Sequence, residues 1–250
     1  MANKYGRQKI GAVLFWLVVW QVCSMCIGQE ILLVSPVAVC GKLLALVQEV
    51  SFWQSVAHSA LRIMSGFFLA VFCGVTAAAF SAKYHLLEIL LQPMVSAVKA
   101  TPVASFTILA LVWVSSANLS VLIAFLMAFP VMYGNLLQGF RQADKQIWEM
   151  VCLFGVHRKI RYYWFPQLFP YVRAAIATGI GLCWKAGTAA EVIGMPKGSV
   201  GERLQQAKVY LQMPELFAWT VTIVAVSVCM EKCILFLLDK AERKNKGQSV

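Results

Sequence analysis

Three charged side chains that could interact with a solute lie inside long apolar stretches: Lys99, Lys185 and Glu191. A charged residue inside a membrane segment is costly and usually faces a cavity or a partner. Pro102 removes a backbone hydrogen bond and can open a helix toward such a cavity. We therefore expect Lys99 to line the inner part of a path for anionic or zwitterionic solutes, with Lys185 and Glu191 nearer its outer end. Alternatively, the span starts near Gln92 and Lys99 extends its ammonium group to the membrane surface.

The sequence lacks the residue sets that catalysis or metal binding would need. No Ser/His/Asp set appears at useful spacing, and no G-x-x-x-x-G-K-[ST] phosphate loop is present. Cys23 and Cys26 have the spacing of metal ligands, but no second pair or histidine accompanies them. Most of the eight cysteines lie in apolar runs, where cysteine acts as a small hydrophobe. We expect no catalytic site, no metal, no cofactor and no nucleotide chemistry in this chain.

The composition is that of an integral membrane protein. Of the 250 residues, 60% are hydrophobic and 13% are charged, whereas a soluble domain carries about a quarter charged residues. The net charge of +11 could suggest nucleic acid as a partner. However, the basic residues gather at the ends and between apolar runs, as expected for loops of a membrane protein. We expect the lipid bilayer, and no nucleic acid, as a partner.

Six apolar runs are long enough to be membrane-spanning helices. They cover residues 10–33, 54–80, 86–114, 119–138, 168–193 and 215–238. The third run is interrupted at Lys99 and Pro102, and Gly66 and Gly74 in the second would allow close helix packing. Residues 34–51 and 194–214 are expected to be connections, and 239–250 a basic tail. The prediction is an all-α polytopic membrane protein with one domain, 1–250, and a core at 54–238.

The lysine and arginine residues predict the orientation of these spans. Four fall on one side: Lys42, Lys197, Arg203 and Lys208. Thirteen fall on the side that holds both termini: Lys4, Arg7, Lys9, Lys83, Arg141, Lys145, Arg158, Lys159, Arg161, Lys240, Arg243, Lys244 and Lys246. Because cytoplasmic loops are enriched in these residues, both termini and the tail are expected in the cytoplasm.

A short apolar helix is expected at residues 145–154, between the fourth and fifth spans. Asp144 can cap its start, and Gly155 can end it in a left-handed conformation. Ten residues would span about 15 Å, which is too short to cross a bilayer. Most of the helix surface is nevertheless apolar, so something must cover it. The candidates are a partner protein and the membrane surface, on which an amphipathic helix can lie.

Glu149, Gly155 and Pro166 resemble the EAA loop of ABC-transporter permeases, E-A-A-x-x-x-G followed by an apolar residue and L-P. Here Met150 and Val151 replace the alanines, and the interval from glycine to proline is about two residues shorter than usual. The resemblance implies that loop 139–167 is cytoplasmic and docks on an ATPase subunit. The residues it assigns to this coupling are Glu149, Gly155, Arg158, Phe165 and Pro166.

Further motifs resemble permeases of the nitrate/sulfonate/taurine type. They are Ser59-x-x-Arg62-Ile63-x-x-Gly66, Lys99-Ala-Thr-Pro102 with Leu111-Val-Trp113, and Trp184-Lys185 followed by Ala189-Ala190-Glu191. Together with a glycine-rich loop at residues 194–201, they occur in the family's order along about 180 residues. The candidate path residues are therefore Lys99, Pro102, Trp113, Lys185 and Glu191.

The resemblance implies the membrane permease subunit of a bacterial ABC importer, with a type I importer fold, in the inner membrane. Its expected partners are a second permease copy, a pair of cytoplasmic ATPase subunits and an extracytoplasmic solute-binding protein. ATP hydrolysis is expected on the ATPase chain, so this chain is not itself an enzyme. The alternatives are a secondary transporter or channel that works without ATP and a membrane-embedded enzyme, which the missing catalytic residues disfavour.

Overall fold

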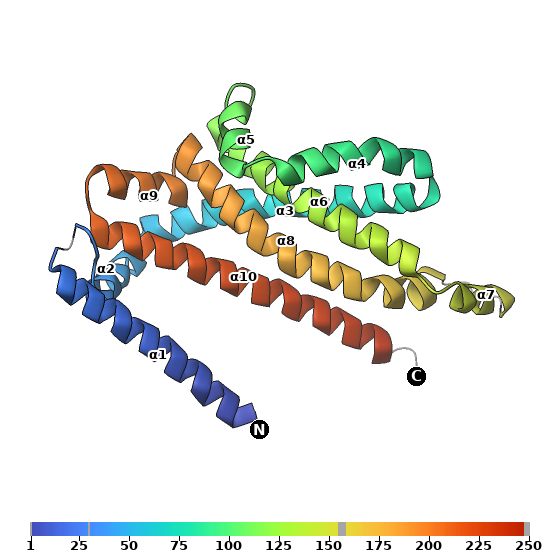
Figure 1. The fold of residues 1–250 in the computed structure, drawn as a ribbon, viewed down its shortest axis with the longest axis horizontal. Coiled ribbons are helices and arrows are strands. Elements are labelled where there is room, and N and C mark those ends of the chain that lie inside the picture. The colour runs from blue at the N-terminus through green and yellow to red at the C-terminus, as the bar shows by residue number, and fades with distance from the viewer. Residues whose placement is uncertain (1, 30, 155–158, 248–250) are drawn as a thin grey trace.

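The computed structural model describes residues 2–29, 31–154 and 159–247, and it contains no β-strand in these ranges. The all-α prediction is therefore confirmed. The helices, all but η1 labelled in Figure 1, are α1 (Ala2–Ile27), α2 (Pro36–Val47), α3 (Val50–Lys83), α4 (His85–Ala100), α5 (Val103–Ala110), α6 (Ser116–Gln142), α7 (Lys145–Leu153), η1 (Ile160–Trp164), α8 (Phe165–Gly194), α9 (Val200–Val209) and α10 (Met213–Gly247).

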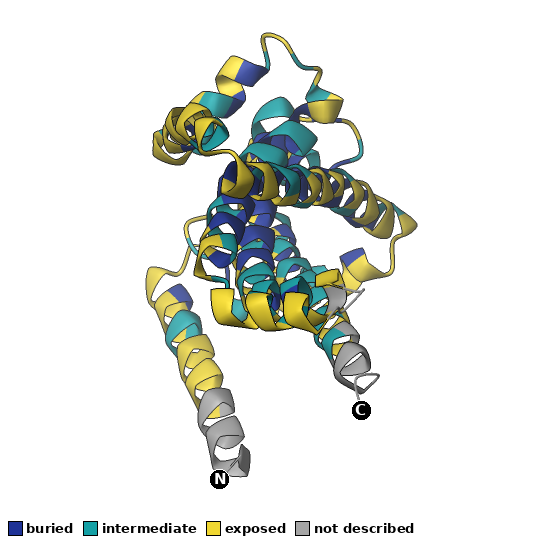
Figure 2. Cartoon of the chain, turned by 90° about the vertical axis from the view of Figure 1, so that its right-hand side faces the viewer, coloured by how far each residue is buried: buried dark blue, intermediate teal, exposed yellow. Residues whose placement is uncertain are grey.

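The centre of the molecule is a bundle of α3, α6 and α8. Buried residues follow these three helices, whereas the outer helices are largely exposed (Figure 2). Glycines bring the backbones together: a Cβ at Gly66 would lie 2.3 Å from the Val121 carbonyl oxygen, and one at Gly74 would lie 2.6 Å from the Met132 Cβ. The expectation that Gly66 and Gly74 allow close helix packing is confirmed.

A second cluster joins α2, α9 and α10 to the first turns of α3. The Phe52 and Trp219 rings stack with centroids 4.9 Å apart, and Lys42 pairs with Glu215 at 3.0 Å. Helix α1 contacts this cluster through Trp20, and the rest of α1 lies apart from the bundle (Figure 1).

The predicted count of six spans is not confirmed. Within the described residues, three helices are long and apolar enough to cross a membrane: α3, α6 and the part of α10 from Met213 to Lys240. Helices α4 and α5 would make a fourth span, but they are bent by 104°. The apolar part of α1, Gly11–Ile27, is short, and the 30-residue helix α8 contains the charged residues Arg173, Lys185 and Glu191.

Several predicted boundaries also differ from the structure. Helix α1 ends at Ile27 rather than at residue 33, and Gly28 follows with a φ of 63°. The predicted connections at 34–51 and 194–214 contain helices α2 and α9. Helix α10 continues to Gly247, through most of the segment predicted to be a tail.

Candidate functional site

The break in the third apolar run lies at Thr101 and Pro102. Helix α4 ends at Ala100, and both residues of the break have extended backbone angles, with ψ of 131° and 134°. Proline disfavours the helical conformation in the residue before it, which explains why the helix stops at Ala100. The Thr101 hydroxyl donates to the Ala97 carbonyl at 2.7 Å and so satisfies a terminal acceptor of α4.

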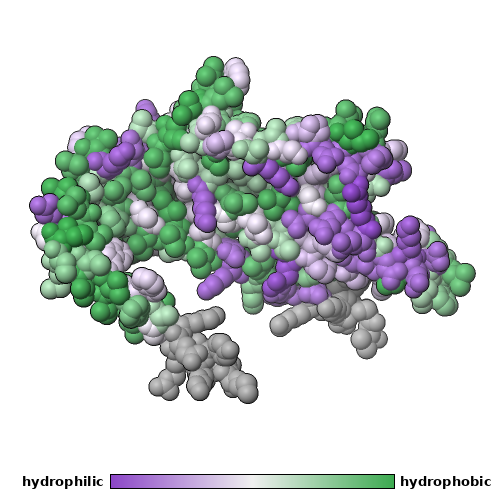
Figure 3. All heavy atoms as spheres, viewed as in Figure 1, coloured by the Kyte–Doolittle hydropathy of each residue, from purple (hydrophilic) through white to green (hydrophobic). Residues whose placement is uncertain are grey.

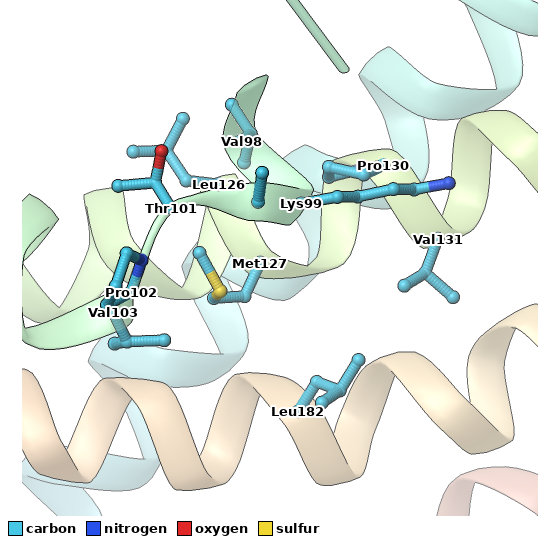
Figure 4. Close-up of a pocket in the computed structure, with 11 residues that line it drawn as sticks. Val98, Lys99, Thr101, Pro102, Val103, Leu126, Met127, Pro130, Val131 and Leu182 are labelled. Atoms are coloured by element: carbon cyan, nitrogen blue, oxygen red, sulfur yellow. The ribbon is translucent and has the colours of Figure 1, made fainter. Parts of the chain in front are cut away.

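This break forms one wall of a partly open pocket of about 390 Å³, whose lining residues are drawn in Figure 4. Leu126, Met127, Pro130 and Val131 of α6 and Leu182 of α8 form much of the remaining lining. Lys99 is the one charged residue among the described residues that line it. Its ammonium lies beside Gly134 of α6, where a Cβ would be 3.7 Å from Nζ. The predicted pair Lys99 and Pro102 thus meets at an apolar pocket with one positive charge.

The other predicted path residues lie outside this lining. Lys185 is exposed on α8, one turn beyond Leu182, and Trp113 is exposed just after α5. Glu191 has no exposed surface and accepts a hydrogen bond from the Ser59 hydroxyl at 2.5 Å. The roles of these three residues in a path stay predictions.

At the other predicted site, helix α7 begins and ends close to the expected residues. The Asp144 carboxylate accepts a hydrogen bond from the Gln146 N–H at 2.8 Å, which confirms the predicted cap. Glu149 and Pro166 are exposed, and the Phe165 ring lies 5.5 Å from that of Phe169. The two remaining coupling residues, Gly155 and Arg158, lie outside the described residues.

Helix α7 is held through an aromatic cluster at its base. The Trp148 ring lies 5.0 Å from the Tyr163 ring and 6.0 Å from the Trp164 ring. The Tyr163 hydroxyl donates to the Asp144 carbonyl at 2.9 Å, and burial, followed by the negative charge of Asp144, raises the pKa of Tyr163. Tyr163 belongs to the π-helical turn η1, which sequence reasoning missed. The sequence did contain the aromatic block at 162–165 that builds this turn.

Comparison with known proteins relates the sequence of this chain to a family of transport proteins. The model of the family "binding-protein-dependent transport system inner membrane component" matches residues 66–245. A probable ABC transporter permease protein of Brucella melitensis is 24% identical over 217 residues, covering 86% of this chain and 86% of that protein. The taurine transport system permease protein of Escherichia coli is 24% identical over 232 residues, covering 89% and 84%. A putative ABC transporter permease protein of Methanocaldococcus jannaschii is 20% identical over 239 residues, covering 93% and 90%.

The family match covers well over half of the chain, including the central helices, the pocket and the α7 segment. The curated relatives extend the similarity over most of the chain, and all are permease proteins. The chain therefore belongs to the family of inner-membrane components of binding-protein-dependent transport systems, and it is a permease of the ABC-importer class.

Proposed function

We propose that this chain forms one half of the solute path of an ATP-driven importer and that α7 couples this path to a cytoplasmic ATPase subunit. A second copy of the chain completes the path, and a solute-binding protein delivers the solute on the outer side. Both termini and α7 lie in the cytoplasm of this arrangement, and the complex resides in the bacterial inner membrane. ATP hydrolysis takes place on the partner chain.

The observation that carries this proposal is the uncovered apolar surface of α7. Ile147, Met150, Leu153 and Phe154 are all exposed, with exposed fractions from 40% to 84%. Among the described elements, α7 contacts η1 alone, and Lys159, just before η1, contacts Trp148 and Cys152 rather than these four apolar residues. A nine-residue helix is too short to lie across a bilayer.

Hydrophilic side chains concentrate at the end of the molecule that carries α7 (Figure 3). This end is expected on the cytoplasmic side, where an ATPase subunit can cover α7.

The open pocket at Lys99 supports a path that a second copy completes. Its lining is largely apolar and includes Lys99, whose ammonium lies beside Gly134 and can attract a small solute with an anionic group, so the pocket favours anionic or zwitterionic solutes. Lys185 and Trp113 are exposed, so they are available to a path that continues beyond this pocket. In the competing interpretation the Lys99 side chain extends to the membrane surface. The charge-reversing substitution Lys99→Glu distinguishes the two interpretations.

Reconstitution tests the proposed function against a transporter that works without ATP. The chain is inserted into proteoliposomes with and without its ATPase partner, together with the cognate binding protein. The Escherichia coli relative is named for taurine, a zwitterionic sulfonate, so labelled taurine is the first solute to test. We expect uptake that requires both ATP and the ATPase chain. Solute uptake by the permease alone, driven by an ion gradient, would instead establish a secondary transporter.

A further inference from the structure

The carboxyl group of Glu191 is buried within the protein, three residues before α8 ends at Gly194. A buried carboxylate is strongly destabilising unless it is paired or hydrogen-bonded. Its surroundings therefore have to supply donors, and they come from elements that are distant in the sequence.

One carboxylate oxygen of Glu191 connects α8 to α3 and to the start of α9. The Ser59 hydroxyl of α3 donates to Oε2 at 2.5 Å, and the Gly201 N–H of α9 donates to the same oxygen at 3.4 Å. The Ser59 oxygen in turn accepts the Val200 N–H at 2.9 Å. Val200 and Gly201 are the first two residues of α9, so these bonds satisfy N–H groups that have no partner within that helix.

The approach of α9 to α8 is so close that it requires a glycine. A Cβ at Gly201 would lie 2.4 Å from both the backbone carbon and the Cβ of Glu191. Real Cβ atoms do not approach other atoms to this distance, so a side chain here would force α9 away. The hydrogen bond from Gly201 and the close packing of Gly201 against Glu191 therefore both hold α9 against α8.

The other side of the carboxylate faces α3 and α6. Glu191 Oε1, Arg62 Nη1 and Ser120 Oγ are buried and have no hydrogen-bond partner among the described residues. Arg62 lies three residues after Ser59 on α3, the helix that supplies the first donor to this carboxylate. One oxygen of Glu191 is thus bonded to α3 and α9, while its second oxygen has no hydrogen-bond partner among the described residues.

We propose that Glu191 is a positioning residue for transport: its carboxyl group locks α9 onto α3 and α8. In the proposed orientation, on which the role in transport rests, α9 lies on the outer face between the last two long helices. The lock then holds this outer element in register with α8, whose Leu182 lines the pocket.

Hydrogen exchange of the intact permease tests the lock itself, without any transport measurement. In Glu191→Ala and Ser59→Ala, amides in peptides covering residues 199–203 should exchange about tenfold faster than in the wild type, because their acceptors are lost. Ser55→Ala is the matched control: Ser55 is one turn earlier on α3, equally buried, and its hydroxyl bonds within its own helix to the Ser51 carbonyl. In this control, exchange in α9 should not change.

Glu191→Gln separates hydrogen bonding from charge and protects the test against a variant that fails to fold. Its amide oxygen can accept the same bonds from Ser59 and Gly201, so α9 should stay protected although the side chain can no longer carry a charge. Unchanged α9 exchange in both Glu191→Ala and Ser59→Ala would overturn the lock.

Reconstituted complexes test the role in transport separately. Loosening α9 should raise ATP hydrolysis in the absence of binding protein and lower uptake per ATP, and Glu191→Gln should restore most of the coupling. If Glu191→Ala loosens α9 but leaves coupling unchanged, the positioning role is wrong although the lock exists. If the wild-type chain shows no ATP-dependent uptake, the proposed function fails while the exchange result still stands.

Discussion

Two short helices at opposite ends of the molecule have nearly the same length but very different surroundings (Figure 1). Helix α7 has nine residues and none is buried, and α9 has ten, of which Val200, Gly201 and Ala207 are buried. Helix α9 contacts α3, α8 and α10, whereas α7 contacts η1 alone among the described elements. The apolar residues, however, are more prominent in α7 than in the polar sequence of α9. Sequence hydrophobicity therefore does not identify the helix that is integrated into the bundle.

This difference indicates two distinct tasks. Helix α9 is fixed by a buried polar network and by a glycine contact, so its position is determined within the chain. Helix α7 is fixed at its base by aromatic residues and leaves its apolar side uncovered. The first arrangement suits an element that must move with the bundle, and the second suits an element that binds another protein.

The largest expected effect is an all-or-none difference in accessibility. Lys145→Cys on α7 and Lys208→Cys on α9, each in a cysteine-free background, should react with a membrane-impermeant maleimide from opposite sides. We expect Lys208→Cys to react in intact cells and Lys145→Cys to react after the membrane is opened, because the basic loops are expected to be cytoplasmic. Both side chains are exposed, so neither should be protected by the fold. Labelling of both from the same side would refute the proposed topology.

A charge on the uncovered side of α7 should have the next largest effect. Met150→Glu should lower ATP-driven uptake about 100-fold, because a carboxylate would have to be buried at the dock with the ATPase. The amount inserted and the melting temperature should not change, because the Met150 side chain is 57% exposed in the chain alone. Met150→Leu is the matched control and should transport normally. Normal uptake by an inserted Met150→Glu variant would remove α7 from the coupling assignment.

The contrast between the two ends also explains how much of the structure could be predicted. Helix α7 was predictable because its determinants are local: the Asp144 cap, an apolar surface and a length too short for a span. The position of helix α9 was missed because it depends on Ser59 of α3. Ser59 bonds to Glu191, 132 positions away, and to Val200 of α9, 141 positions away. One local signal was available, since Ser199-x-x-Glu202 matches a capping box and Ser199 does accept the Glu202 N–H at 3.0 Å.

The pocket was predictable in part for the same reason. Lys99 and Pro102 are close in the sequence, so their meeting at a break follows from local rules. The 104° bend and the contributions of α6 and α8 depend on packing between distant segments, which periodicity does not reveal. The burial of Glu191 could not be predicted either, because a charged residue in an apolar run can face either a path or a polar network inside the protein.

The substitution Lys99→Glu tests the pocket, in the region between α7 and α9. If Lys99 lines the path, Lys99→Glu should lower uptake of an anionic or zwitterionic solute about tenfold, through repulsion in the pocket. ATP hydrolysis stimulated by the binding protein should survive, because neither α7 nor α9 is altered. Lys83→Glu, at the exposed end of α3 and outside the pocket, is the control and should leave uptake unchanged. If Lys99→Glu leaves uptake per inserted molecule unchanged, Lys99 is not part of the path.

The smallest expected effects come from the N-terminal caps of the two short helices. Replacing either Asp144 or Ser199 by alanine should cost about 1 kcal/mol, since each side chain accepts one N–H of a first helical turn. The consequences should differ, because α7 is uncovered and Ser199 is buried where α9 packs onto the bundle. Asp144→Ala should speed amide exchange within α7 alone and leave the melting temperature of the permease unchanged. Ser199→Ala should lower that melting temperature by about 2–4 °C. Equal losses of melting temperature in the two variants would mean that α7 is as much a part of the folded core as α9, and the contrast between the two ends would be wrong.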